Sequence, residues 1–132
     1  MKYINAFKQV LAVIVALTGC PLLAQEIPVP AAYVASPDIY QVLLENDEVL
    51  VLKMVLQPGQ GDNWHKHNAE TVYFQQGGSV LIKTDDNKDI ALDIPDGFVM
   101  WHEQWQHQVT NTGKTPITAI IVEKKVVKKD TK

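Results

Sequence analysis

The feature that most limits the fold of this chain is a series of short apolar runs, each ended by turn-forming residues. Segments rich in Gly, Pro, Asn and Asp separate them, as in Pro58-Gly59-Gln60-Gly61. Runs of this length and spacing are typical of β-strands in a sandwich or barrel. No segment beyond residue 24 holds a helical period over ten or more residues, so the sequence predicts an all-β domain. The runs cover residues 39–44, 49–56, 71–74, 79–84, 90–94, 99–101, 106–110 and 118–122.

The run at residues 49–56 indicates which side chains face the core. Successive side chains of a strand point to opposite faces, and Lys53 marks the face turned to solvent. Val51 and Val55 share that face, which leaves an inner set of Leu50, Leu52, Met54 and Leu56. We interpret the inner set as barrel core, with the alternative that part of it forms the floor of a ligand pocket.

The first 24 residues are typical of a secretory signal peptide. Lys2 and Lys8 are followed by a short apolar run and then by a helix-breaking Gly-Cys-Pro. The apolar run is too short for a transmembrane span. The sequence therefore predicts a signal peptide at residues 1–24 and export of the mature protein to a bacterial periplasm.

Two cleavage sites compete within this leader. The segment that ends at Cys20 resembles a bacterial lipobox, in which the cysteine becomes lipidated and anchors the protein to a membrane. The ordinary signal peptidase would instead cleave after Ala24 and release a soluble protein, and an uncleaved anchor is the third alternative. Cys20 is the only cysteine, so a metal in this protein must be held by nitrogen and oxygen rather than by a cluster of thiolates.

The rest of the chain divides into three parts. Residues 25–37 hold three of the seven prolines and predict an extended arm. The domain itself is predicted at residues 38–123, and a lysine-rich tail follows at residues 124–132. The stretch that starts at Glu123 carries five lysines and two acidic residues. We expect it to be a solvated end, with weak attraction to an anionic surface as the alternative.

The charged residues argue against two classes of partner: acid substrates gripped by an arginine, and nucleic acids. All twelve basic residues are lysines, and the formal net charge is −3. Without arginine the chain has no planar guanidinium that grips a carboxylate or phosphate through two parallel hydrogen bonds. The acidic balance also argues against nucleic-acid binding, which requires neutralisation of phosphates.

Four residues predict a metal site. His65 and His67 share one face of a strand, with Cα atoms roughly 6–7 Å apart, so both imidazoles can reach one ion. Glu70 brings a carboxylate three residues later, and His107 lies in a separate strand-like segment. Three imidazoles and one carboxylate suit a single divalent transition metal such as Mn, Fe, Co, Ni, Cu or Zn.

Around these residues the chain resembles the cupin family. The first cupin motif, which runs Gly, His-x-His, Glu, Gly, is matched by Gly59, His65, His67, Glu70 and Gly77. The second motif is matched by Gly97, His107 and Asn111. Two departures stand out: the gap between His67 and Glu70 is shorter than usual, and Glu103-Gln104-Trp105 replaces a Pro-x-Gly turn.

The resemblance implies a fold and a set of ligands. The fold is a jelly-roll barrel, or double-stranded β-helix, over roughly residues 39–122. The implied metal ligands are His65, His67, Glu70 and His107. The chain is most similar to small single-domain cupins, some of them named for β-alanine degradation, and this similarity also implies a homodimer.

Three functions remain open at this point. The first is a metal-dependent enzyme, of oxygenase, isomerase or hydrolase type, that acts on a small molecule inside the barrel. His102, Glu103 and Tyr73 are its candidate catalytic residues, as proton handlers near the ion. The second is a non-catalytic periplasmic module that binds a small molecule, and the third is a cupin whose metal is purely structural.

Overall fold

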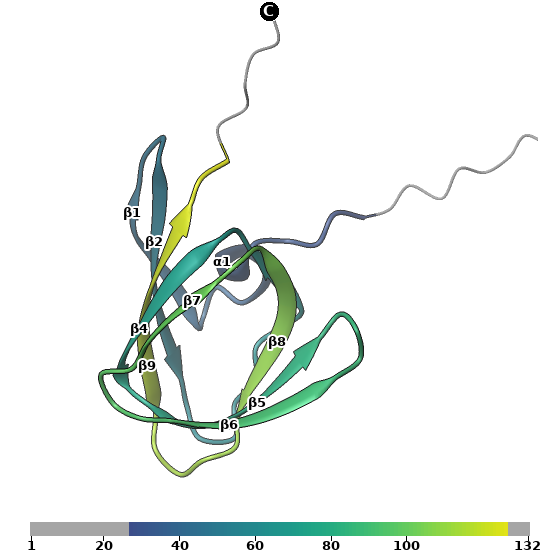
Figure 1. Ribbon diagram of the computed structural model, residues 1–132, viewed down its shortest axis with the longest axis vertical. Helices are drawn as coiled ribbons and strands as arrows, with labels where there is room; N and C mark the ends of the chain where they lie inside the picture. Colours follow the sequence, from purple (N-terminus) through teal and green to yellow (C-terminus); the bar gives the residue numbers. More distant parts are fainter. Residues whose placement is uncertain (1–26, 127–132) are drawn as a thin grey trace, which may run out of the picture.

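The computed structural model of the chain describes residues 27–126 (Figure 1). The predicted signal peptide at residues 1–24, with both cleavage sites, lies outside the described residues, as does most of the predicted lysine-rich tail. Among residues 27–126, no helix has the length and apolar character needed to span a bilayer.

The described residues form one short helix and nine strands in two antiparallel sheets. In chain order the elements are α1 (Ala32–Ala35), β1 (Tyr40–Glu45), β2 (Val49–Leu56), β3 (His65–His67), β4 (Glu70–Gln76), β5 (Gly78–Thr84), β6 (Asp89–Ile94), β7 (Val99–His102), β8 (Trp105–Asn111) and β9 (Ile117–Lys124). One sheet has the order β1-β2-β9-β4-β7 and the other the order β3-β8-β5-β6. The two sheets lie on opposite sides of the barrel (Figure 1). The prediction of an all-β domain is confirmed.

The core lies between the two sheets and follows the predicted alternation. In β2 the four inner side chains predicted from the sequence are buried, while the side chains between them are partly exposed. Leu52 and Leu56 are fully buried, and each such leucine stabilises the fold by roughly 1.5–3 kcal/mol relative to an exposed position. β9, the neighbour of β2 in the sheet, adds Ile117, Ala119 and Ile121 to the same core.

The predicted extended arm contains a turn of helix. Residues Ala32–Ala35 form α1 between Pro30 and Pro37, and Ala32 is fully buried in the core. Just before the helix, the carbonyl of Pro30 accepts a hydrogen bond of 2.9 Å from the backbone N–H of Lys66 in β3. β3 is only three residues long and pairs with β8 on one side, so the arm supports its other side.

The turn between β4 and β5 explains one glycine of the cupin-like motif. A Cβ atom on Gly77 would lie 1.9 Å from the carbonyl oxygen of Ile94. The backbone N–H of Gly77 also donates a hydrogen bond of 2.7 Å to Asp96. Only glycine fits this close approach of two backbones.

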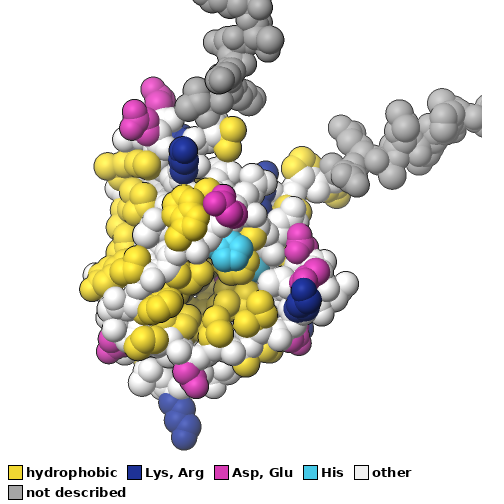
Figure 2. Space-filling view, in the orientation of Figure 1, with side chains coloured by type: hydrophobic (Ala, Val, Ile, Leu, Met, Phe, Trp, Pro, Cys, Tyr) yellow, Lys and Arg dark blue, Asp and Glu magenta, His cyan; other side chains and the backbone are white. Residues whose placement is uncertain are grey.

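The apolar side chains of β6 are only partly covered. This strand is the last of its sheet and pairs with β5 alone among the described strands. Its apolar side chains Ile90 and Leu92 are 38% and 44% exposed. Figure 2 shows a hollow on one face of the molecule that is rimmed mainly by hydrophobic side chains.

Candidate metal centre

Three histidines meet inside the barrel. His65 and His67 lie on β3, and His65 is the direct cross-strand partner of His107 on β8. All three side chains are buried, with ring centroids 4.5–5.2 Å apart. One nitrogen from each ring lies within 4.8 Å of the others, which makes this set a candidate for holding a metal ion. The structure thus brings together the three histidines that the sequence singled out.

Hydrogen bonds fix which nitrogen of two of these rings is free. Nδ1 of His65 lies 2.7 Å from the carbonyl oxygen of Asn63, and Nδ1 of His67 lies 2.6 Å from Oε1 of Glu123. A carbonyl or carboxylate oxygen only accepts, so both Nδ1 atoms donate and carry the proton. In the neutral form of each ring, Nε2 then keeps its lone pair, as metal binding requires.

The distance between those lone pairs indicates a shared cation. Nε2 of His65 and Nε2 of His67 are 2.9 Å apart. Two lone pairs at this distance repel each other unless a proton or a metal ion lies between them. Two imidazole nitrogens that bind one ion at 2.0–2.1 Å stand about 3 Å apart when the angle at the ion is near 90°. The geometry of the donor set therefore fits a metal.

Burial favours the metal-binding form of two of the rings. Burial lowers the pKa of His65 to about 4, and it lowers the pKa of His107 still further. Both imidazoles are therefore neutral near pH 7, which is the form that binds a metal. Burial also acts to lower the pKa of His67, but the hydrogen bond to Glu123 and the charge of Glu70 outweigh it, so the pKa of His67 is raised.

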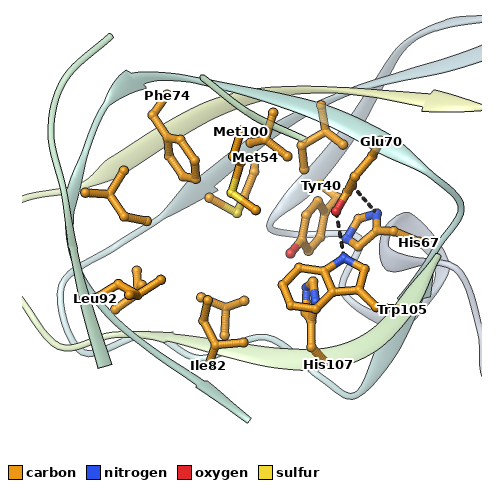
Figure 3. A pocket seen from close by; sticks show the side chains of 15 residues that line it. Tyr40, Met54, His67, Glu70, Phe74, Ile82, Leu92, Met100, Trp105 and His107 are labelled. Carbon is orange, nitrogen blue, oxygen red and sulfur yellow. Dashed lines mark hydrogen bonds and ion pairs between the residues drawn. The ribbon is translucent and has the colours of Figure 1, made fainter. Parts of the chain in front are cut away.

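Glu70 lies beside His67 but in a separate group of donor atoms. Its Oε1 accepts a hydrogen bond of 2.8 Å from Nε1 of Trp105, and its Oε2 lies 3.2 Å from Nδ1 of His67 (Figure 3). The single proton of that Nδ1 is directed at Glu123, so Oε2 of Glu70 has no hydrogen-bond partner among the described residues. Glu70, Glu123 and His67 together form a second group able to hold an ion. A role for Glu70 as fourth ligand stays a prediction.

Glu123 is the functional side chain that sequence reasoning missed. We expected it at the start of a solvated end, and this is wrong, because Glu123 is only 2% exposed. It is the last inward-facing residue of β9, two positions beyond Ile121. Besides His67, its carboxylate accepts a hydrogen bond of 3.2 Å from the backbone N–H of Asn68. The alternation of β9, continued by one step, is the signal that would have found it.

A second buried carboxylate lies behind His65. Oδ2 of Asp62 accepts a hydrogen bond of 2.6 Å from the hydroxyl of Tyr40, and Oδ1 accepts one of 2.6 Å from the backbone N–H of Val109. Oδ2 also lies 3.7 Å from Nδ1 of His65. Burial raises the pKa of Asp62 to about 6 and raises the pKa of Tyr40 well above its ordinary value.

The region as a whole is rich in buried carboxylates, whose ion-pair partners among residues 27–126 are histidines. Three carboxylates, of Asp62, Glu70 and Glu123, are each at most 2% exposed. In residues 27–126 none of them forms an ion pair with a lysine. Buried carboxylates are costly unless a positive charge lies nearby, and a divalent cation among the histidines would supply that charge.

Comparison with known proteins gives the fold independent support. No protein-family model matches the sequence, and no curated protein matches it. A solved cupin domain from Bordetella pertussis is 24% identical over 76% of this chain and 99% of that one, with a TM-score of 0.61. An RmlC-like cupin family protein from Methanocaldococcus jannaschii, with a double-stranded β-helix fold, is 14% identical over 65% of this chain and 78% of its own, with a TM-score of 0.53. The chain has the cupin fold.

A third solved structure agrees with this assignment. A protein with a double-stranded β-helix domain from Klebsiella pneumoniae is 22% identical over 64% of this chain and 75% of that one, with a TM-score of 0.51. At such identities the likeness establishes the fold of this chain. Its chemistry has to be argued from its own residues.

The cavity of the barrel lies next to the histidines. It has a volume of about 60 Å³. His67, Glu70, Trp105 and His107 gather at one end of it, and Phe74 and Leu92 lie at the other (Figure 3). His65 is not on the cavity wall.

The three candidate catalytic residues lie outside the cavity and are half-buried or exposed. His102 is half-buried and stacks on Trp105 with ring centroids 3.8 Å apart. Glu103 is exposed and accepts a hydrogen bond from Trp101. Tyr73 is 44% exposed on an outward-facing position of β4. None of the three lines the cavity, and their roles as proton handlers stay predictions.

Proposed function

We propose that this protein is an exported, metal-dependent cupin enzyme that acts on a small molecule inside the barrel. The observation that carries the proposal is the pair of Nε2 atoms 2.9 Å apart on His65 and His67, both with Nδ1 already donating. His107 completes the set of three buried imidazoles. The leader at residues 1–24 supports export.

The metal, when bound, would polarise a substrate oxygen or lower the pKa of a bound water. The chain's own residues prepare the site for it. Asn63 and Glu123 hold the rings of His65 and His67 with Nε2 directed at a common point. Such outer partners of ligand histidines fix the tautomer and make the ring a stronger ligand.

Glu70 is the side chain best placed to act on a bound molecule. It lines the cavity, and Trp105 holds its Oε1 by a hydrogen bond. Its Oε2 has no hydrogen-bond partner among the described residues, so this oxygen is available to complete the ligand set or to take a proton. Burial raises the pKa of Glu70, which moves it toward the range in which a carboxylate serves as a general base at neutral pH.

Elemental analysis of the purified full chain tests the proposal. We expect a stoichiometric transition metal in the wild-type protein and a large loss of it in the His107→Ala variant. The His102→Ala variant is the matched control, because His102 stacks on Trp105 outside the three-histidine group and its loss should leave the metal content unchanged. Wild-type protein without a transition metal would contradict the proposal.

A second measurement separates an enzyme or binding module from a structural metal. Protein loaded with Co²⁺ is titrated with azide, and its visible spectrum is followed. An exchangeable coordination position predicts a spectral change on azide binding. An unchanged spectrum would mean a closed site, and the metal would then serve only to stabilise the fold.

A further inference from the structure

The cavity changes character sharply along its length. Five of its fifteen lining residues are polar or carry a ring nitrogen, and the other ten are apolar. The five gather around the histidines, whereas the far end is formed by side chains such as Phe74, Ile82 and Leu92 (Figure 3). We propose that the cavity takes a short, mainly apolar molecule with a single polar end directed at the histidines. The orientation of that polar end rests on the proposed function. The preference for an apolar body rests on the cavity walls alone.

The polar end of the cavity has few free partners to offer. The hydroxyl of Tyr40 already donates to Asp62, and Nε1 of Trp105 already donates to Glu70. Among buried side-chain atoms of the described residues, Oε2 of Glu70 and Nδ1 of His107 have no hydrogen-bond partner. One polar group of a bound molecule therefore meets an ion, Glu70 or His107.

A second polar group on the same molecule would have no partner. The far end of the cavity presents only hydrocarbon and thioether groups. An amide, hydroxyl or charge buried there without a hydrogen bond loses its hydration without compensation, and a charge loses most. No lysine lines the cavity, and the chain has no arginine. The walls thus select against dicarboxylates, amino acids and sugars.

The volume sets the size of the molecule. One water needs about 10–15 Å³ of such a cavity, so a cavity of about 60 Å³ takes roughly four to six non-hydrogen atoms. Leu92 lines the cavity and is 44% exposed. The cavity therefore opens toward solvent along β6, and a longer apolar chain would extend there.

The methionines of the chain report on this cavity directly. The sequence has three of them, and Met54 and Met100 both line the cavity while Met1 lies in the predicted signal peptide. Full-length protein with ¹³C-labelled methionine methyl groups therefore gives two signals that respond to a bound molecule. Titration of metal-free and metal-loaded protein uses two pairs of probes of equal size and charge, butan-1-ol with propane-1,3-diol and butanoate with 3-hydroxypropanoate. Within each pair only the far end of the molecule differs, a methyl group in one and a hydroxyl group in the other.

We expect butan-1-ol to shift both signals in either form of the protein, and butanoate to shift them in the metal-loaded form. Propane-1,3-diol should bind at least tenfold more weakly than butan-1-ol, and 3-hydroxypropanoate at least tenfold more weakly than butanoate. The Leu92→Asp variant should weaken butan-1-ol binding severalfold. The matched control Ala91→Asp places the same charge on the neighbouring, outward-facing position of β6 and should leave binding unchanged.

The inference is overturned if propane-1,3-diol binds as tightly as butan-1-ol, if 3-hydroxypropanoate binds as tightly as butanoate, or if no probe shifts either signal. Its failure is distinguishable from failure of the proposed function. Butan-1-ol binding to a protein that takes up no metal would leave the ligand class standing and remove the enzyme. Metal uptake without any shift of the methionine signals would leave the metal site standing and remove the proposed ligand class.

Discussion

The two ends of the cavity are built by the same strands and yet carry opposite kinds of side chain, ionisable at one end and apolar at the other. β4 contributes Glu70 at one end and Phe74 at the other, and β8 contributes His107 and, two residues later, Val109. All four side chains are buried or nearly so. The inward positions of a strand are thus occupied by ionisable groups at one end and by hydrocarbon at the other.

The difference indicates what each end is for. Apolar side chains at inward positions stabilise the fold through burial. Three histidines and two carboxylates, of Glu70 and Glu123, at inward strand positions cost stability, because ionisable groups lose their hydration there. The buried Asp62, just before β3, adds a third carboxylate. A barrel built only for stability would place hydrocarbon at both ends. The polar end is therefore best explained by a group of donor atoms that could hold a metal ion.

Among variants that test the difference between the two ends, His107→Ala is expected to have the largest effect, on the affinity for metal. Loss of one of three imidazoles should lower the affinity for Zn²⁺ or Co²⁺ by at least about 1,000-fold, beyond the 10–100-fold typical for loss of an outer partner of a ligand. Calorimetric titration of metal-free protein measures it.

Val109→Ala is the control from the same strand, at the next inward-facing position after His107. It should lower the free energy of unfolding by about 1–3 kcal/mol through lost burial. The affinity for metal should stay within about twofold. Equal losses of metal affinity in the two variants would mean that the ends do not differ in function.

The next effect concerns the stability cost of Asp62 at the polar end. Its pKa is raised from 3.8 to about 6 in the folded protein, so folding favours the protonated carboxyl. The stabilisation is present below pH 3.8 and is lost as the pH rises through 6, by about 3 kcal/mol in all. Asp62→Asn should lack this loss, because an amide does not ionise.

Urea denaturation of metal-free protein across this pH range measures the effect. The free energy of unfolding of wild type minus that of Asp62→Asn should fall as the pH rises. The histidines titrate in both proteins and cancel in the difference. A difference that stays constant with pH would show that Asp62 does not carry the raised pKa.

The smallest of the three effects is expected for Glu123→Gln. The amide oxygen can still accept a hydrogen bond from Nδ1 of His67, but the negative charge behind the ring is gone. We expect metal affinity to fall by about 10–100-fold. Glu48→Gln, on an exposed residue, should have no effect. Loss of affinity in both variants would indicate a general effect of net charge instead.

Much of the fold and part of the site follow from the sequence. The eight apolar runs all form strands, and the inner face of β2 is the predicted one. His-x-His fixes a shared face by strand alternation alone. The pairing of His65 with His107 depends on the register of β3 and β8, which the local pattern does not contain. The cupin resemblance implied only that the two histidines share a metal site.

What the sequence did not predict comes from long-range contacts. Glu123 meets His67 across 56 residues of chain, and Tyr40 meets Asp62 across 22. A run of lysines after Glu123 suggested a solvated end, while its position two residues after Ile121 decides that it is buried. The short helix Ala32–Ala35 was missed because one turn has no period to detect.

The position of a bound ion tests the central claim most directly. Crystals of the metal-loaded protein, measured at the absorption edge of the metal, give an anomalous peak at the ion. We predict a peak about 2.0–2.2 Å from one nitrogen each of His65, His67 and His107, with Nδ1 of His67 still bonded to Glu123. A peak on the Nδ1 side of His67, between Glu70 and Glu123, or no peak inside the barrel at all, would contradict the account.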